Sequence, residues 1–231
     1  MKKLKRVFRL VILGVLLLIV AAGVGYYFGR QSNTTKKEKT ELATDVTSNF
    51  ISQIGSTAQQ LAAANDLYAS VMIAQAIHES NSGQSGLSLS PYYNLFGIKG
   101  AYNGQTVKML TWEDDGTGNV TNVYADFRSY PSYAESLEDY VGILKQSWFS
   151  EAWKSNTKSY EDATLALTGT YATDSSYNTK LNAIIKQYDL TRFDNDNAAN
   201  GEVVVYNIYR QQYTTQSVLD EDTAWANRNG Q

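Results

Sequence analysis

The sequence has no cysteine and a single histidine, His78, among its 231 residues. The lack of cysteine excludes disulfide bonds, cysteine nucleophiles and thiolate metal sites. The zinc-binding pattern H-E-x-x-H would need a second histidine at position 82, which is Ser82. A serine–histidine triad would have to use the same His78, and no G-x-S-x-G nucleophile turn is present. We therefore expect His78 to be structural and the protein to need no metal or cofactor.

Acidic residues are missing from the first thirty positions, which contain six lysines and arginines. The remaining 201 residues contain 14 basic and 23 acidic residues, and hydrophobic residues make up 43% of the chain. This composition is typical of a globular protein. A net acidic globular part argues against a nucleic-acid partner, because binding phosphates requires a basic face.

Charge is also missing from 10–28, a run of 19 apolar or small residues that is preceded by five cations. A helix of this length spans about 28 Å, close to the hydrocarbon thickness of a bilayer. The flanking cations predict a cytoplasmic segment over 1–9 and an exported remainder. We expect a single-pass anchor in the cell membrane, followed by a polar extracellular stalk over 29–43. A cleaved signal peptide is the alternative, because Ala21-Ala22-Gly23 could serve a peptidase.

The pattern of apolar residues predicts helices on both sides of a small hairpin. Apolar residues recur at helical spacing from about Thr44 to Ala62. The helix predicted over 68–80 is apolar on nearly all sides and should be buried. Two strands, predicted over 106–112 and 122–127, flank the turn sequence DDGTGN.

Helical patterns resume after this hairpin. Ser132 and Glu135 form an S-x-x-E capping pattern before a helix that extends to about Lys145. Further helices are predicted over 160–167 and 176–188. The sequence thus predicts one α+β domain over 44–192, with a cleft where the hairpin lobe meets the helices. The tail, 193–231, contains one strand-like run at 203–206, and the sequence predicts no function for it.

Glu79 combines features of a catalytic acid. It ends the predicted buried helix and precedes a loop rich in glycine and serine. Apolar surroundings and the negative end of the helix dipole both disfavour its ionised form. A carboxyl group that stays protonated near neutral pH can protonate the leaving oxygen of a glycoside. A solvent-exposed glutamate at a frayed helix end is the alternative.

Four motifs occur in order across about 45–190. They are AQAIHES at 74–80, YNLFGIKG at 93–100, FRSY at 127–130 and YATD at 171–174, the last followed by Tyr177. Together they resemble the family 73 glycoside hydrolases, which are bacterial endo-β-N-acetylglucosaminidases. The sequence departs from many relatives at Asn81-Ser82-Gly83, where they have Gly-Trp-Gly. The resemblance implies a lysozyme-like fold and cleavage of the β-1,4 bond after N-acetylglucosamine in peptidoglycan.

The resemblance also implies which residues form the site. It places the general acid at Glu79 and a second carboxylate at Glu113, with Asp114 or Asp115 as alternatives. Tyr171 is implied as a catalytic tyrosine that orients the acetamido group or a water. The residues that we expect to bind sugar are Asn94, Phe96, Tyr177, Trp112 and Tyr93, with Tyr92 and Tyr102 as weaker candidates. The second carboxylate could activate water, attack the sugar or stabilise positive charge, and the acetamido group could itself be the nucleophile.

The predicted function is hydrolysis of peptidoglycan by an anchored ectodomain, for cell-wall remodelling or cell separation. The anchor would keep the enzyme near its polymer. One alternative is a muramidase or lytic transglycosylase of the same fold, which cuts the neighbouring bond. Another is a non-catalytic module that binds glycan or scaffolds a division complex, although such a module would not need Glu79.

Overall fold

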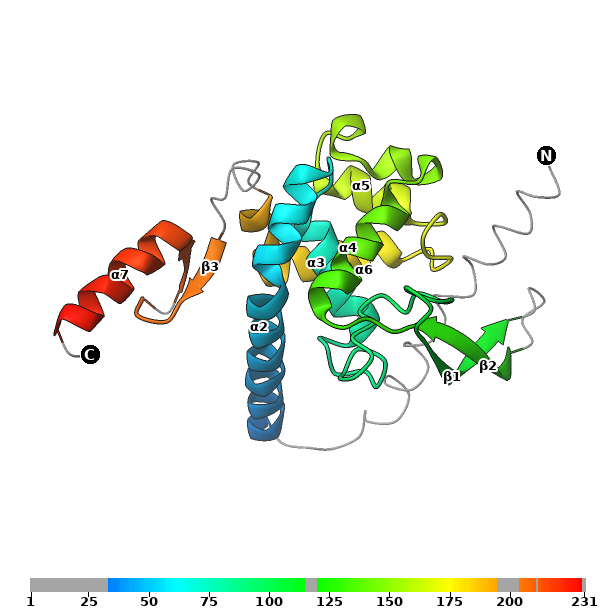
Figure 1. The fold of residues 1–231 in the computed structure, drawn as a ribbon, viewed down its shortest axis with the longest axis horizontal. Helices are drawn as coiled ribbons and strands as arrows, with labels where there is room; N and C mark the ends of the chain where they lie inside the picture. Colours follow the sequence, from blue (N-terminus) through cyan, green and yellow to red (C-terminus); the bar gives the residue numbers. More distant parts are fainter. Residues whose placement is uncertain (1–32, 115–119, 195–203, 211, 230–231) are drawn as a thin grey trace.

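The computed structural model describes residues 33–114, 120–194, 204–210 and 212–229. The predicted anchor over 10–28 lies outside these residues. Within them, no helix is both long enough and apolar enough to cross a membrane. Figure 1 shows a helical body, with a β-hairpin on one side and a small C-terminal segment on the other.

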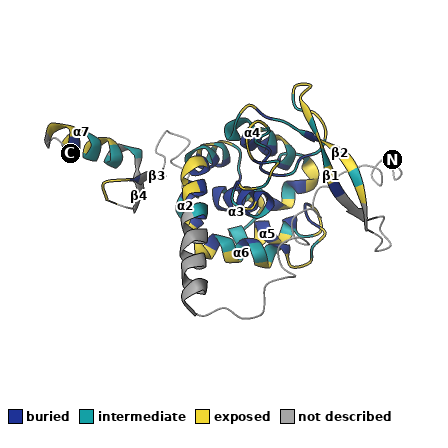
Figure 2. Cartoon of the chain, turned by 90° about the horizontal axis from the view of Figure 1, so that it is seen from below, coloured by how far each residue is buried: buried dark blue, intermediate teal, exposed yellow. Residues whose placement is uncertain are grey.

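The body is built around α3 (Ala69–Ser80), in which every residue except His78 is buried. Its neighbours include α2 (Asn33–Ala64), α5 (Tyr160–Leu167), α6 (Tyr177–Gln187) and the short 3₁₀ helix η3 (Leu190–Phe193). Figure 2 shows α3 as a largely buried element inside the surrounding helices. The apolar run of α3 therefore forms the centre of the core, as its sequence predicts.

The predicted hairpin is confirmed and is longer than expected. Strand β1 (Thr106–Asp114) pairs antiparallel with β2 (Val120–Arg128), from Thr106 opposite Arg128 to Asp114 opposite Val120. The hairpin leads into α4 (Tyr133–Leu144), which packs against α2. At the start of α4, the Ser132 hydroxyl accepts a hydrogen bond from the Ala134 amide at 3.1 Å. The capping pattern therefore begins a helix, as predicted.

Two parts of the structure differ from the sequence-based expectation. The first helix, predicted from about Thr44, begins at Asn33 as α2, within the polar segment that we expect to be a stalk. Its lysines, glutamates, leucine and alanine have high helix propensity, which explains a helix without an apolar face. The tail contains a hairpin of β3 (Val204–Asn207) and β4 (Gln212–Thr215), followed by α7 (Gln216–Asn229). Only the first of these strands is predicted by the sequence.

Short 3₁₀ helices complete the body. They are η1 (Ser147–Ala152) and η2 (Lys154–Asn156), between α4 and α5. The mixed architecture confirms the predicted α+β class.

Candidate active site

Glu79 occupies the last turn of α3, one residue before the helix ends. The helix stops at Asn81, which adopts a left-handed conformation (φ 52°, ψ 54°) and donates its backbone N–H to the Ile77 carbonyl. The chain then turns tightly at Gly83, whose φ is +75° and where a β-carbon would approach the Phe50 ring to 2.7 Å. A glycine is therefore needed at position 83 to bring the following loop against α2.

The Glu79 carboxyl group is buried, and its two oxygens have different surroundings. The residue is only 8% exposed. Oε1 accepts a hydrogen bond from the Tyr177 hydroxyl at 2.8 Å. Oε2 makes no hydrogen bond to any described residue and is not among the fully enclosed unpaired atoms. One oxygen is thus held by the protein, and the other has no hydrogen-bond partner among the described residues.

Burial raises the pKa of Glu79 from 4.5 to about 8, and the hydrogen bond from Tyr177 only partly opposes this rise. A group with this pKa is mostly protonated at pH 7. Glu79 therefore holds a transferable proton under neutral conditions, which is what general acid catalysis requires.

Two further polar residues, which the sequence does not predict as part of the site, extend the hydrogen bonding from Tyr177 into the core. Gln75 donates its side-chain amide to the Tyr177 hydroxyl oxygen at 3.0 Å. The Tyr140 hydroxyl donates in turn to the Gln75 side-chain oxygen. One sequence signal could have identified Gln75, since it is a polar residue in an apolar run, about one helical turn before Glu79. Nothing comparable marks Tyr140, which lies 65 positions away from Gln75.

The two tyrosines of the YATD motif region lie together, but they differ in their contacts. The rings of Tyr171 and Tyr177 stack with centroids 6.0 Å apart. Tyr177 is 1% exposed and bonds to Glu79, so its predicted role in sugar binding is corrected to one of holding the acid. The enclosed hydroxyl of Tyr171 makes no hydrogen bond within the described part of the chain. A buried hydroxyl in this state is commonly paired with an ordered water.

Asp174, the last residue of the same motif, fixes the start of α6. Its carboxylate accepts hydrogen bonds from the Ser176 amide at 2.9 Å and the Ser176 hydroxyl at 2.7 Å. It also forms an ion pair with Lys180. The hydrogen bonds from Lys180 and Ser176 lower the pKa of Asp174 to about 2. Asp174 therefore stays ionised and positions Tyr177, the first residue of α6.

His78 packs its ring edge against Tyr177, with centroids 5.7 Å apart. Burial lowers the pKa of His78, and Lys180 adds to this effect. Among the described residues, no group of three or more histidine, aspartate and glutamate side chains is arranged to hold a metal ion.

The predicted sugar contacts of Asn94 and Phe96 are wrong in this structure, because neither side chain presents a surface to a glycan. Phe96 has no exposed surface and stacks on Tyr140 with centroids 3.9 Å apart. Asn94 is 1% exposed, and its amide donates to the carbonyls of Ile98 and Arg128 at 3.0 and 2.8 Å. Its oxygen accepts from the Ile98 amide at 3.0 Å. Both residues hold the loop and the hairpin in place.

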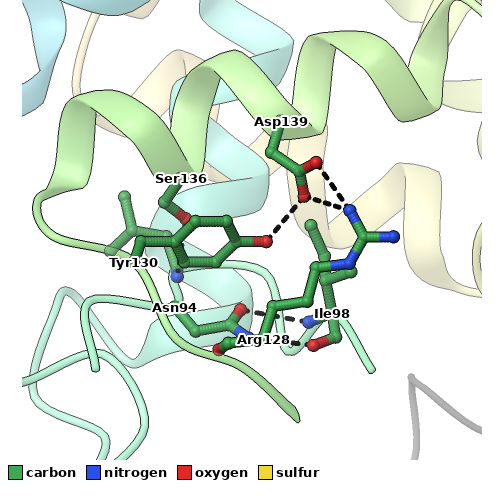
Figure 3. A network of polar contacts seen from close by, with 7 residues as sticks. Asn94, Ile98, Arg128, Tyr130, Ser136 and Asp139 are labelled. Atoms are coloured by element: carbon green, nitrogen blue, oxygen red, sulfur yellow. Dashed lines mark hydrogen bonds and ion pairs between the residues drawn. The ribbon is translucent and has the colours of Figure 1, made fainter. Parts of the chain in front are cut away.

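A polar cluster joins this loop and the hairpin base to α4 (Figure 3). Asp139 accepts hydrogen bonds from Arg128 at 2.6 and 2.5 Å and from the Tyr130 hydroxyl at 2.7 Å. The Ser136 hydroxyl oxygen accepts from the Leu95 amide at 3.1 Å. The FRSY and YNLFGIKG motifs therefore build the scaffold that sets the hairpin lobe against the helical body.

The remaining predicted site residues lie on or near the hairpin lobe. In β1, Trp112 pairs with Asn122 and Glu113 pairs with Thr121. The structure does not describe the side chains of Trp112 and Glu113, and Asp115 lies outside the described residues. Tyr93 is half-buried and packs edge-on against Tyr133, with centroids 5.4 Å apart. Tyr102 packs against Tyr130 at 4.8 Å, and Tyr92 is half-buried.

A central helix that ends in a buried acid, beside a small antiparallel hairpin, is the arrangement of a lysozyme-like glycosidase domain. Family comparison makes this assignment specific. The chain belongs to the glucosaminidase family, described as mannosyl-glycoprotein endo-β-N-acetylglucosaminidase, whose profile matches residues 55–190. The family expected from the motifs is thereby confirmed.

Relatives and solved structures agree with this assignment. The autolysin of Enterococcus faecalis is 54% identical over 154 residues, which cover 64% of this chain and 21% of the relative. A probable N-acetylmuramidase of Lactococcus lactis is 48% identical, over 69% of this chain and 38% of the relative. The crystal structure of the catalytic domain of the autolysin Auto from Listeria monocytogenes is 43% identical. It superposes with a TM-score of 0.62 and covers 72% of this chain and all of that domain.

The exo-glucosaminidase LytG of Bacillus subtilis is 37% identical, over 64% of this chain and 54% of the relative. This chain therefore spans about a fifth to a half of the curated relatives named here. The range matched by the family profile, residues 55–190, contains Glu79.

Proposed function

We propose that this protein is a peptidoglycan hydrolase that cleaves the β-1,4 bond after N-acetylglucosamine, with Glu79 as the general acid. The observation that carries the proposal is the state of the Glu79 carboxyl group. It is buried, has a pKa of about 8 and is held through Oε1 by Tyr177, while Oε2 has no partner among the described residues. Such a group can protonate the glycosidic oxygen as the bond to the sugar breaks.

Family membership and the names of relatives support the substrate and the bond. An autolysin and an exo-glucosaminidase are both similar to this chain, each over 64% of its length. The name of the Lactococcus relative, probable N-acetylmuramidase, favours the neighbouring bond and makes muramidase activity the second candidate. The family description favours the first, because it specifies N-acetylglucosamine.

We assign the second carboxylate to Glu113 and a substrate-orienting role to Tyr171. Glu113 lies in β1 of the hairpin lobe, at the position that the family resemblance indicates. Tyr171 stacks on the tyrosine that holds Glu79, and its enclosed hydroxyl has no partner in the described structure. That hydroxyl would bind a water molecule, through which it would orient the acetamido group of the substrate.

We further propose that 10–28 anchors the enzyme in the cell membrane and leaves its catalytic domain outside the cell. The apolar run and its five preceding cations support this location. Full-length protein that fractionates with membranes at its full mass would agree with an anchor. A secreted chain that begins near Gly23 would show cleavage instead.

The test of the proposed bond is a product analysis. Purified sacculi are digested with the full-length protein in detergent, the fragments are reduced with borohydride, and the reduced ends are identified by mass spectrometry. We expect reduced N-acetylglucosamine at the new ends. Reduced N-acetylmuramic acid would establish the muramidase, and an anhydro-muramic end would establish a lytic transglycosylase. The Glu79→Gln variant, prepared identically, controls for contaminating hydrolases.

A further inference from the structure

A chain of hydrogen bonds extends inward from the catalytic acid. The Tyr140 hydroxyl donates to Gln75, the Gln75 amide donates to Tyr177 at 3.0 Å, and Tyr177 donates to Glu79 Oε1 at 2.8 Å. The four residues come from α3, α4 and α6. Gln75 and Tyr140 have no exposed surface, and Tyr177 is 1% exposed.

The direction of this chain is set by the chemistry of its members. An amide nitrogen can only donate, so the Tyr177 oxygen must accept from Gln75 and its proton must point to Glu79. If the Gln75 amide were reversed, its nitrogen would face Tyr140. The Tyr140 proton would then lack an acceptor, because its hydroxyl bonds to no other described residue. Only the first orientation gives every hydroxyl proton of this buried chain an acceptor.

We propose that Gln75 and Tyr140 are positioning residues that fix the proton of neutral Glu79 on Oε2, the oxygen that the protein leaves for the glycan. The inference rests on the proposed role of Glu79 as the acid. A neutral carboxyl group has one O–H and can place it on either oxygen. Because Tyr177 donates to Oε1, that oxygen must act as an acceptor, and the acid proton is left on Oε2.

Removing the Gln75 amide weakens this preference. The Tyr177 oxygen then has a free lone pair and can accept a proton from Glu79 Oε1, which directs the acid proton into the core. The ionised form of Glu79 also loses support, because a tyrosine that accepts from an amide is a stronger donor to a carboxylate. Loss of Gln75 should therefore lower turnover and stabilise the neutral form of Glu79.

The groups around Glu79 allow its titration to be followed. Three tyrosines interact electrostatically with Glu79, namely Tyr140 on α4, Tyr171 between α5 and α6, and Tyr177 on α6. Burial raises the pKa of each well above its ordinary value, while burial lowers the pKa of His78 on α3. The basic limb of the pH–rate profile, where the acid loses its proton, should thus report Glu79.

The experiment compares kcat/KM as a function of pH for the full-length protein and two variants. Gln75→Met keeps the length of the side chain and removes its polar atoms, and Tyr140→Phe removes one oxygen. We expect Gln75→Met to lower kcat about 10-fold, the effect of losing one hydrogen bond in the transition state. Its basic limb should move to higher pH by about half a unit or more. Tyr140→Phe should shift the limb in the same direction by less.

Thr164→Val is the matched control, because it also removes a buried hydroxyl with hydrogen bonds, to Glu161 and Asn182. It should lower the melting temperature and leave the limb in place. If the basic limb of the pH–rate profile of Gln75→Met stays in place or moves to lower pH, the inference is overturned. If Gln75→Met does not fold, Tyr140→Phe decides by the same criterion. Activity that survives in Glu79→Gln would instead refute the proposed function, whatever the two positioning variants show.

Discussion

Replacing Glu79 with glutamine should make the protein more stable, and the gain should grow with pH. The pKa of Glu79 is about 8 in the folded protein, against an ordinary value of 4.5. Between these values the folded state binds more protons than the unfolded state, so the free energy of unfolding falls as pH rises. Glutamine does not titrate, and it keeps the pattern of neutral Glu79, with an oxygen to accept from Tyr177 and a nitrogen in the place of Oε2.

The size of the effect follows from the difference between the two pKa values. At about 1.36 kcal/mol per pKa unit, the full difference corresponds to an upper limit of about 5 kcal/mol. Water that reaches Oε2 reduces the cost of the charge, so we expect a gain of about 2–4 kcal/mol at pH 9. For a chain of this length, that gain raises the melting temperature by about 5–15 °C. Near pH 4 both states are protonated, and the gain should vanish.

The assay is thermal unfolding of wild type and Glu79→Gln in detergent at a series of pH values from 4 to 9. The difference between the two proteins cancels the pH effects that they share. Glu138→Gln, on the exposed face of α4, is the matched control and should show no such trend. A difference for Glu79→Gln that is flat or falls with pH would refute the conclusion that this carboxyl group is buried in its neutral form.

Three further predictions, one of them with a matched control, test the site and its scaffold. Tyr171→Phe should raise the free energy of unfolding by about 1 kcal/mol, because it removes an unpaired buried hydroxyl. It should also lower turnover. A lower free energy of unfolding would show that the hydroxyl has a partner. Asp139→Ala should cost about 2–4 kcal/mol in denaturant unfolding, since it removes the partner of Arg128 and Tyr130. Asp126→Ala, in an exposed ion pair at 3.8 Å, should cost less than about 1 kcal/mol, and equal losses would contradict the scaffold role of Asp139. Phe96→Ala should cost about 3–5 kcal/mol, as expected for a core aromatic residue, whereas unchanged stability would restore its role as a sugar contact.

The sequence predicts those features that depend on neighbouring residues. The apolar run of α3 places Glu79 at the end of a buried helix, and the turn sequence between the strands predicts the hairpin. Both signals are local, since they depend on periodicity and turn chemistry within about ten residues.

Roles that depend on distant partners could not be predicted in the same way. Tyr177 contacts Gln75 from 102 positions away and Glu79 from 98, so its spacing carries no sign of these bonds. Asn94 and Phe96 belong to a motif near the site, yet their partners, Arg128 and Tyr140, make them part of the scaffold. Membership of a motif therefore predicts that a residue lies near the site. The three-dimensional contacts are needed to distinguish the catalytic acid from the residues that support it.

The central claim is that Glu79 supplies the proton for glycoside cleavage, and the most direct test is a rate measurement. The release of reducing sugar from purified sacculi is measured near neutral pH for wild type, Glu79→Gln and the control Glu138→Gln, with folding confirmed by circular dichroism. We expect a loss of at least about 100-fold for Glu79→Gln, the range of general acid catalysis, and a wild-type rate for the control. A folded Glu79→Gln protein that retains more than about a tenth of the wild-type rate would contradict it.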